Sequence, residues 1–356
     1  MEHAYLSAPH RTSTTDPQET LTIMHSSLIK TILSATTLIA ISLLFSLNAK
    51  AADPGAAYPA TSEASDTKAG SLLIYNYFNS DSSNASARNT TINLTNTHPT
   101  RSVIVHFFFV TSLCSVADFK AKLTQNQTYS FDVADIDPDI AGYIMVLAEN
   151  SDGVPITHNA LIGDAYIRDD FKSVNLSAVS FSADWGVIGT ALPSYVNTSP
   201  TADVQFSGVS GGYNRLPMAV ALSSLPSRAA GDRTMLILNS IGGSYLTSAG
   251  VGTGAIFGIL YDDAERSASF SLSFSCQYAR ILDDNTPRTV PRYSTFVPAG
   301  RTGWMRLYSQ DGTTALMGAM MVWNIIPSGA RQGAHNLHHL TLSSTPVVMT
   351  MPVFPF

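Results

Sequence analysis

Short strand-like runs, rich in aliphatic and aromatic residues, recur along the chain after residue 70. The first group lies at residues 71–78, 90–95, 102–110, 128–133 and 143–148. Clusters of Gly, Asn, Asp, Ser and Pro separate the runs, and residues 150–153 have the composition of a hairpin turn. Short strands at this spacing are typical of an antiparallel β-sandwich.

The second half of the chain repeats the first in outline. Residues 234–238 match 91–94, 255–261 match 103–109, 293–296 match 129–131, 303–305 match 142–144, 311–312 match 152–153, and 316–318 match 161–163. The order is kept, while the gaps differ by several residues. Preserved order indicates a duplicated unit. A chance match is the alternative, because strand and turn patterns resemble one another.

The predicted fold class is all-β, with two tandem antiparallel β-sandwich domains, Ig-like or jelly-roll-like, after a signal peptide and a flexible linker. Stretches rich in Ala, Pro, Gly, Ser and Thr without apolar periodicity predict the linkers. The expected boundaries are a leader at 1–51, a linker at 52–69, a first domain at 70–182, a linker at 183–199 and a second domain at 200–356.

Composition supports sheets over helices. Charged residues make up 13% of the chain, about half the usual share. Past residue 51 the only glutamates are Glu63, Glu149 and Glu265, so the polar helix formers are scarce. The 20 Lys and Arg against 26 Asp and Glu give a net charge of −6, which argues against a nucleic-acid groove.

A secretory signal peptide is predicted at residues 24–51. Met24 is followed by the basic Lys30, an uncharged apolar run at 31–47, and the small-x-small site Ala49-Lys50-Ala51. Cleavage after Ala51 is expected, and an uncleaved anchor is the alternative because the run is slightly long. No later segment of about 20 apolar residues occurs, so no transmembrane helix is expected in the mature chain.

Several stretches resemble a group of exported, β-rich bacterial proteins to which no function is assigned. They are GSLLIYNYFNS, TTINLTNTHPTRSVIVHFFF, LTQNQTYSFDVADIDPDIAGYIM, ARILDDNTPRTVPRYSTFVPAGRTGWM and the C-terminal HNLHHLTL and MPVFPF. The resemblance covers most of residues 70–356. It implies a bacterial source and an envelope or extracellular location, and it transfers no catalytic residue.

Two groups of residues are candidate metal ligands. Asp135, Asp137 and Asp139 alternate as at the start of a calcium loop, but Ile140 stands where a glycine should make the sharp turn. A polar turn is the favoured interpretation.

His335, His338 and His339 form the second candidate, as two imidazoles can share a zinc. On a strand, neighbouring His338 and His339 point to opposite faces, which favours a solvated or hydrogen-bonded edge. No cofactor is expected.

Three patterns suggest enzymes or sugar-binding proteins. Residues 208–212 satisfy G-x-S-x-G around Ser210, but Pro217 opposes the helix that a nucleophile elbow requires, so a flexible loop is predicted. Trp185, Trp304 and Trp323 can stack on sugar rings, although an aromatic residue in a strand is more often part of a core. Paired carboxylates for glycoside hydrolysis remain open, since nothing singles out one pair.

Cys114 and Cys276 are expected to remain unpaired, because a bridge would have to cross between the two predicted domains. An oxidising compartment favours the opposite outcome.

The predicted function is that of a non-catalytic, exported cell-envelope or extracellular protein with a structural, adhesive or binding role. The alternative is a secreted carbohydrate-binding or hydrolytic protein. Other envelope proteins or surface glycans are the expected partners, and nucleic acid is not. Trp and Tyr clustered on the surface beside carboxylates would favour the carbohydrate-binding alternative.

Overall fold

The computed structural model describes residues 56–57 and 64–356, except 171, 197–198, 251–254, 312–313 and 327–330. The predicted leader at 1–51 and most of the linker at 52–69 therefore lie outside the described residues. Strands account for 55% of the structure and helices for 4%, which confirms the all-β class. Residues Asp53–Phe356 form a single compact unit.

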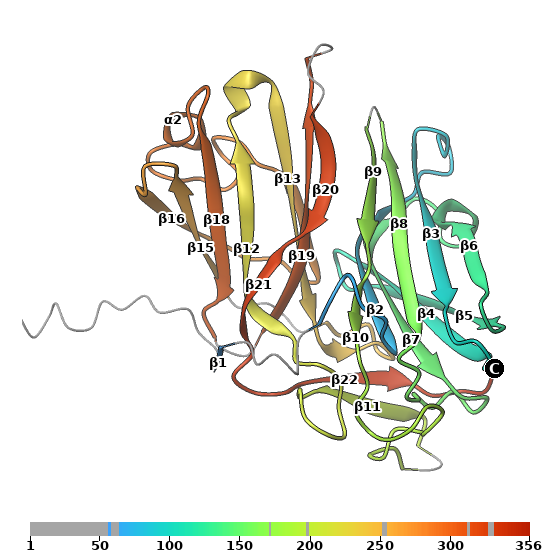
Figure 1. Ribbon diagram of the computed structural model, residues 1–356. Coiled ribbons are helices and arrows are strands. Elements are labelled where there is room, and N and C mark those ends of the chain that lie inside the picture. Colours follow the sequence, from blue (N-terminus) through green and yellow to red (C-terminus); the bar gives the residue numbers. More distant parts are fainter. Residues whose placement is uncertain are drawn as a thin grey trace, which may run out of the picture. The chain divides into compact units, whose positions relative to one another are not determined.

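The expectation of two tandem sandwich domains is wrong. The strands form five small sheets, arranged as a five-bladed β-propeller. Two of the sheets come from the first half of the chain (Figure 1). One is ordered β10 (Val179–Phe181), β2 (Leu72–Asn79), β7 (Ala141–Glu149), β4 (Val103–Thr111) and β5 (Val116–Leu123). The other is ordered β6 (Thr128–Asp132), β3 (Arg88–Asn96), β8 (Leu161–Asp169) and β9 (Lys172–Ser177).

Two further sheets come from the second half. One is ordered β1 (Ala56–Ala57), β21 (His338–Leu342), β12 (Pro217–Pro226), β18 (Thr302–Ser309), β15 (Ile256–Asp262) and β16 (Ser267–Leu272). The other is ordered β17 (Gln277–Ile281), β13 (Asp232–Ile241), β19 (Ala315–Asn324) and β20 (Gln332–Asn336). Apart from β1, each sheet repeats the strand order of its counterpart in the first half, which confirms the duplication predicted from the sequence.

One of the matched segments is an exception. Tyr293–Phe296 forms the short helix α2, whereas its expected match lies in strand β6. Tyr143 and Trp304 do take equivalent places, each directly after a glycine and near the start of a central strand. The other helical turns are η1 (Val133–Asp135) and η2 (Arg228–Ala230).

The fifth sheet shows why the halves are not separate domains. It consists of β11 (Thr201–Phe206), β22 (Val347–Pro352) and β14 (Gly243–Ser244). Its side chains share one apolar core with the first half, where Phe206 and Met349 pack in the same cluster as Leu72 and Phe181. Burial of apolar area is therefore completed between the halves rather than within each one.

A disulfide also joins the two halves, so the prediction of unpaired cysteines is wrong. Cys114 follows β4 and Cys276 precedes β17, with their Cα atoms 5.2 Å apart. The backbone N–H of Cys276 donates to the carbonyl of Ser112 at 3.1 Å, which aligns the two segments. The prediction failed because it treated the halves as separate units.

A histidine-lined candidate binding site

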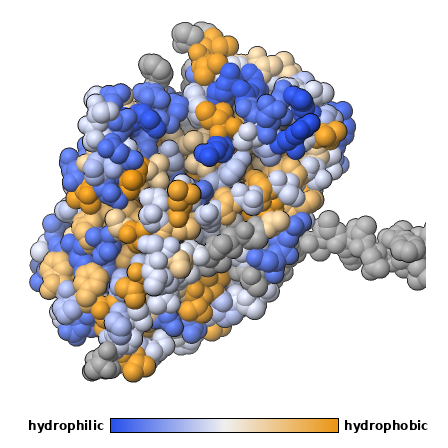
Figure 2. All heavy atoms as spheres, turned by 180° about the vertical axis from the view of Figure 1, so that it is seen from behind, coloured by the Kyte–Doolittle hydropathy of each residue, from blue (hydrophilic) through white to orange (hydrophobic). Residues whose placement is uncertain are grey.

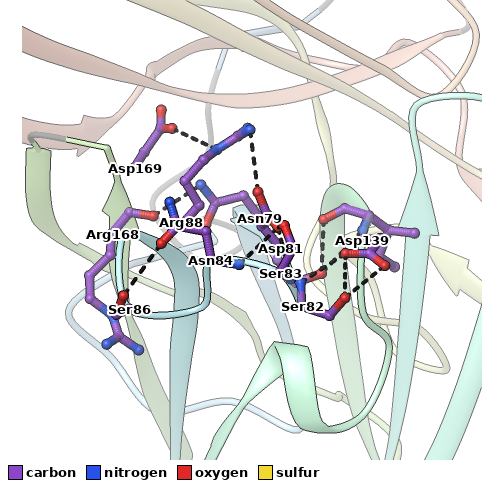
Figure 3. Close-up of polar contacts among 12 residues, drawn as sticks. Asn79, Asp81, Ser82, Ser83, Asn84, Ser86, Arg88, Asp139, Arg168 and Asp169 are labelled. Atoms are coloured by element: carbon purple, nitrogen blue, oxygen red, sulfur yellow. Dashed lines mark hydrogen bonds and ion pairs between the residues drawn. The ribbon is translucent and has the colours of Figure 1, made fainter.

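The candidate calcium ligands Asp135, Asp137 and Asp139, for which a polar turn is the favoured interpretation, do not converge. Asp139 has a left-handed backbone (φ 64°), and its carboxylate accepts hydrogen bonds from the N–H and hydroxyl of Ser82 at 2.8 and 2.9 Å. Figure 3 shows these hydrogen bonds, which connect the loop of Ser82 with the loop of Asp139. Asp135 lies in η1, and the carbonyl of Asp137 accepts from the Ser80 hydroxyl. In the described part of the chain, no group of three His, Cys, Asp or Glu residues is placed to hold a metal.

The G-x-S-x-G segment lies in turns between β11 and β12. The Ser210 hydroxyl donates to the carbonyl of Asp184 at 3.4 Å, and Gly208 and Gly211 have positive φ angles. A nucleophile elbow needs a strand before the serine and a helix after it. The segment is therefore a loop, without the geometry of that motif.

The three histidines, in contrast, do come together. They line a cavity of about 660 Å³ together with Ala64, Ser65, Asp66, Thr67, Val179, Ser223, Asn336 and Leu337. The imidazole rings of His335 and His338 lie near each other, with their centroids 6.0 Å apart. A second cavity of about 290 Å³ shares Asp66 and Thr67 with the first and extends to Gly163 and Ser177. We call the two adjoining cavities the histidine cleft.

The relation between the two halves explains where the histidine cleft lies. Ser177 pairs with the residue after Gly163, and Asn336 pairs with the residue after Gly318, so Ser177 and Asn336 are counterparts in β9 and β20. The Asn336 side chain donates to the Ser177 carbonyl at 2.9 Å. β9 and β20 are equivalent strands of the two halves, and they contact each other (Figure 1). Contact between equivalent elements is the pattern that a local two-fold axis produces.

Each half has a β-bulge at the same place. In β2 the register shifts between Tyr75 and Phe78, and in β12 it shifts between Leu222 and Leu225. The bulge residue Asn76 is fully buried against the second half. Its amide donates to the Gly318 carbonyl at 3.0 Å, and its own carbonyl accepts from the Asn239 amide at 2.9 Å. This side of the local two-fold is closed.

The other side is open. The equivalent bulge residues Ser223 and Ser224 are exposed, and Ser223 lines the histidine cleft. Ser65 pairs with Ser180 through two backbone hydrogen bonds, which places residues 65–68 between the second bulge and the first half. The histidine cleft is therefore the unsealed counterpart of the contact that buries Asn76.

Asn336 fixes the polar wall of the histidine cleft. Its amide donates to the Asp66 carboxylate at 3.2 Å, and its side-chain oxygen accepts from the Asn76 amide at 2.8 Å. Asn76 is in turn held by Asn239 and Gln277 within the buried interface. Because Asn336 is hydrogen-bonded through both its side-chain nitrogen and its side-chain oxygen, its amide is held in one orientation at the cleft.

The histidines differ in their electrostatics. Burial lowers the pKa of the His339 imidazole to about 4; Asp66 raises this pKa and His338 lowers it. His339 is therefore neutral at pH 7, with one ring nitrogen as donor and the other as acceptor. The cleft presents hydrogen-bonding groups of both kinds, together with the carboxylate of Asp66.

We expect His339 to make folding stability depend on pH. Its folded pKa is lower than the ordinary 6.5, so the unfolded chain binds this proton more tightly. The free energy of unfolding should fall as the pH drops from about 6.5 to about 4. Urea titrations at several pH values should show a flatter dependence for His339→Gln. The control His338→Gln changes the exposed neighbour on the same strand; an equal flattening in both variants would contradict the assignment.

The first half also contains a buried cluster of ionisable side chains that no sequence pattern indicated. His106 and Glu149 are fully buried, and the His106 Nδ1 lies 2.8 Å from the Glu149 carboxylate. Its Nε2 lies 2.9 Å from Asp118, and the Lys120 ammonium lies 2.7 Å from Glu149 and donates to the Phe354 carbonyl. Because carboxylates occupy both ring nitrogens, His106 has no free nitrogen with which to act as a base.

The three tryptophans have different surroundings. Trp185 is buried, and its ring N–H donates to the carbonyl of Thr190. Trp323 lies beneath the Lys172 ammonium, 3.9 Å from the ring centroid. Trp304 is 36% exposed and stacks on Tyr261, with ring centroids 4.3 Å apart and planes within 9°. Only Trp304 of the three offers an exposed ring.

No protein-family model matches the chain, and no curated protein matches it either.

Proposed function

We propose that the chain is a non-catalytic, exported binding protein of the cell envelope or extracellular space, and that its ligand occupies the histidine cleft. The observation that carries the proposal is the fixed polar wall of the cleft. A hydrogen-bond network that begins in the buried interface orients the Asn336 amide before any ligand arrives, and this amide in turn donates to Asp66. Groups held in place in advance lose little entropy when they bind.

Two observations support export. The sequence has the layout of a signal peptide at residues 24–51. The disulfide between Cys114 and Cys276 is of a kind that persists in oxidising compartments. Among the described residues, no helix has the length and apolar character required to cross a bilayer.

A second candidate function, carbohydrate binding, is favoured by the exposed Trp304 and its partner Tyr261. The ion pair between Arg301 and Asp263, at 2.8 Å, lies just beyond the ends of the strands that carry this ring pair. On the face drawn in Figure 2, hydrophobic side chains are scattered among hydrophilic ones.

The binding proposal is tested with the exported protein purified from its native cells. An intact mass that lacks residues 1–51 is expected. The protein should retain a component when incubated with soluble and envelope fractions of those cells, and native mass spectrometry would detect it. Asp66→Ala and His338→Ala each alter an exposed cleft residue, and each should reduce retention several-fold.

The matched control is Asp152→Ala, which removes an exposed carboxylate from a turn outside the cleft. It should retain the component as well as the parent does. Equal retention by the parent and both cleft variants, with unchanged melting temperatures, would contradict the assignment of the ligand to the histidine cleft.

A further inference from the structure

Strands β15, β16 and β18 place aromatic rings and hydroxyls in register on one face. Tyr261 pairs with Trp304 on one side and with Ser267 on the other. Four residues along β15, Phe257 pairs in the same way with Tyr308 and Ser271. Directly paired residues of an antiparallel ladder lie on the same face of the sheet. We call these two rows, with the row between them, the aromatic ledge.

The aromatic ledge is accessible from solvent. Trp304 is exposed, while Tyr261, Phe257 and Tyr308 are each half-buried. Side chains that alternate with them, such as Leu260 and Met305, point into the apolar core. The sheet therefore buries its aliphatic residues and presents four aromatic rings to solvent. Exposing this much apolar surface is unfavourable, and such patches are typical of interaction sites.

The flanking residues indicate what covers these rings. Ser267, Ser269 and Ser271 of the edge strand β16 are all exposed beside the rings. An apolar protein surface laid over the ledge would bury these hydroxyls without hydrogen-bond partners, which is unfavourable. A sugar satisfies both kinds of surface, since its C–H face packs on an aromatic ring and its hydroxyls donate to and accept from serine.

The middle row adds a further hydrogen-bonding group. Ile259 pairs with Arg306 and with Ser269, so the Arg306 side chain leaves the sheet between the two aromatic rows, on the same face. The rows are about 13 Å apart, from four residues at about 3.3 Å each. This length suits a chain of several sugar rings and exceeds what one monosaccharide covers.

The aromatic ledge also leads toward the histidine cleft. Beyond Trp304, the next strand of the sheet is β12, where the bulge between Leu222 and Leu225 contains Ser223. Ser223 lines the cleft together with His338, which pairs with Ala221 of the same strand. The ring pair, the bulge and the cleft are thus successive features across one sheet.

We propose that the aromatic ledge is a glycan-binding platform, on which an oligosaccharide stacks against Trp304 and Tyr308 and extends toward the histidine cleft. This inference rests on the proposed function, for which it names the class of ligand. The sugar rings supply apolar faces to the aromatic residues, and their hydroxyls bond to the serines of β16 and to Arg306.

The test uses the exported protein and immobilised oligosaccharides of increasing length, with neutral and uronic-acid chains as separate arms. Binding is expected to strengthen with length until the ledge is covered. Trp304→Ala should weaken binding at least about tenfold, which corresponds to about 1.4 kcal/mol. Trp304→Phe keeps a ring at this position and should retain part of the affinity, which guards against loss of folding. The control is Tyr166→Ala, which removes a ring that is 42% exposed on β8 and should leave binding unchanged.

Three results would overturn the inference: no binding in either arm, equal binding by the parent and Trp304→Ala, or equal loss in Trp304→Ala and Tyr166→Ala. Its failure is distinguishable from failure of the proposed function. If the component retained from native cells still depends on Asp66 and His338 but not on Trp304, and no oligosaccharide binds, the ligand class is wrong while the binding role stands.

Discussion

Replacing Glu149 with alanine should lower the free energy of unfolding by about 3–5 kcal/mol, because the change leaves two buried partners without their counter-charge. Glu149 is fully buried and is the shared partner of His106 and Lys120, whose side chains are almost completely buried themselves. Equilibrium urea unfolding followed by tryptophan fluorescence measures the difference.

Asp118→Asn provides the matched control. Asp118 contacts the same His106 at 2.9 Å, but its side chain is 36% exposed, so water can replace the lost interaction. We expect it to cost about 1 kcal/mol or less. Equal losses for Glu149→Ala and Asp118→Asn would show that burial does not set the strength of this cluster.

Removal of the disulfide should have a comparable effect. The sequence separation of Cys114 and Cys276 is 162 residues, so breaking the bridge frees a very long loop in the unfolded chain. The chain-entropy relation gives about 5 kcal/mol for such a loop, and native bridges typically contribute about 2–5 kcal/mol. The variant Cys114→Ala/Cys276→Ala should show this loss in urea unfolding, without a free thiol to complicate the measurement.

Reduction of the parent protein gives an independent measurement. The unfolding midpoint in a reducing buffer should move toward that of the double variant, while the variant itself should not respond. If the parent has two titratable thiols under native, non-reducing conditions, the bridge is absent and the prediction fails.

Sequence patterns predicted the strands because the tendency to form a strand depends on residues that are close together in the sequence. The aliphatic and aromatic residues of 71–78 and the scarcity of glutamate and lysine are both local signals, and both indicated sheets correctly. The duplication was also readable, since Leu-x-Gly at residues 161–163 and 316–318 occupies equivalent strands. The assignment of 293–296 to a strand failed because a four-residue helix carries no periodic signal.

The arrangement of the sheets was not predictable in the same way. β11, β14 and β22 are far apart in sequence, and their pairing is fixed by side chains packed around Phe206 and Met349. The disulfide depends on that same packing. No local pattern records which sheet faces will be buried against each other.

The site was found in part. The H-x-x-H-H pattern identified His335, His338 and His339, which do line one cavity. Asp66 and Asn336 were missed, because they are 270 residues apart in the sequence and become neighbours only in the folded chain. Asp66 lies in a stretch that its composition assigned to a linker.

The two equivalent bulges differ in how strongly their sequences are constrained, because the one at Asn76 is buried in an interface and the one at Ser223 is exposed. Asn76 is tied to partners that must change with it, so drift at that position is expected to be slow. Ser223 and Ser224 are exposed and free of that constraint. A randomised library at Ser223 and Ser224 should therefore yield folded protein far more often than a library at Asn76.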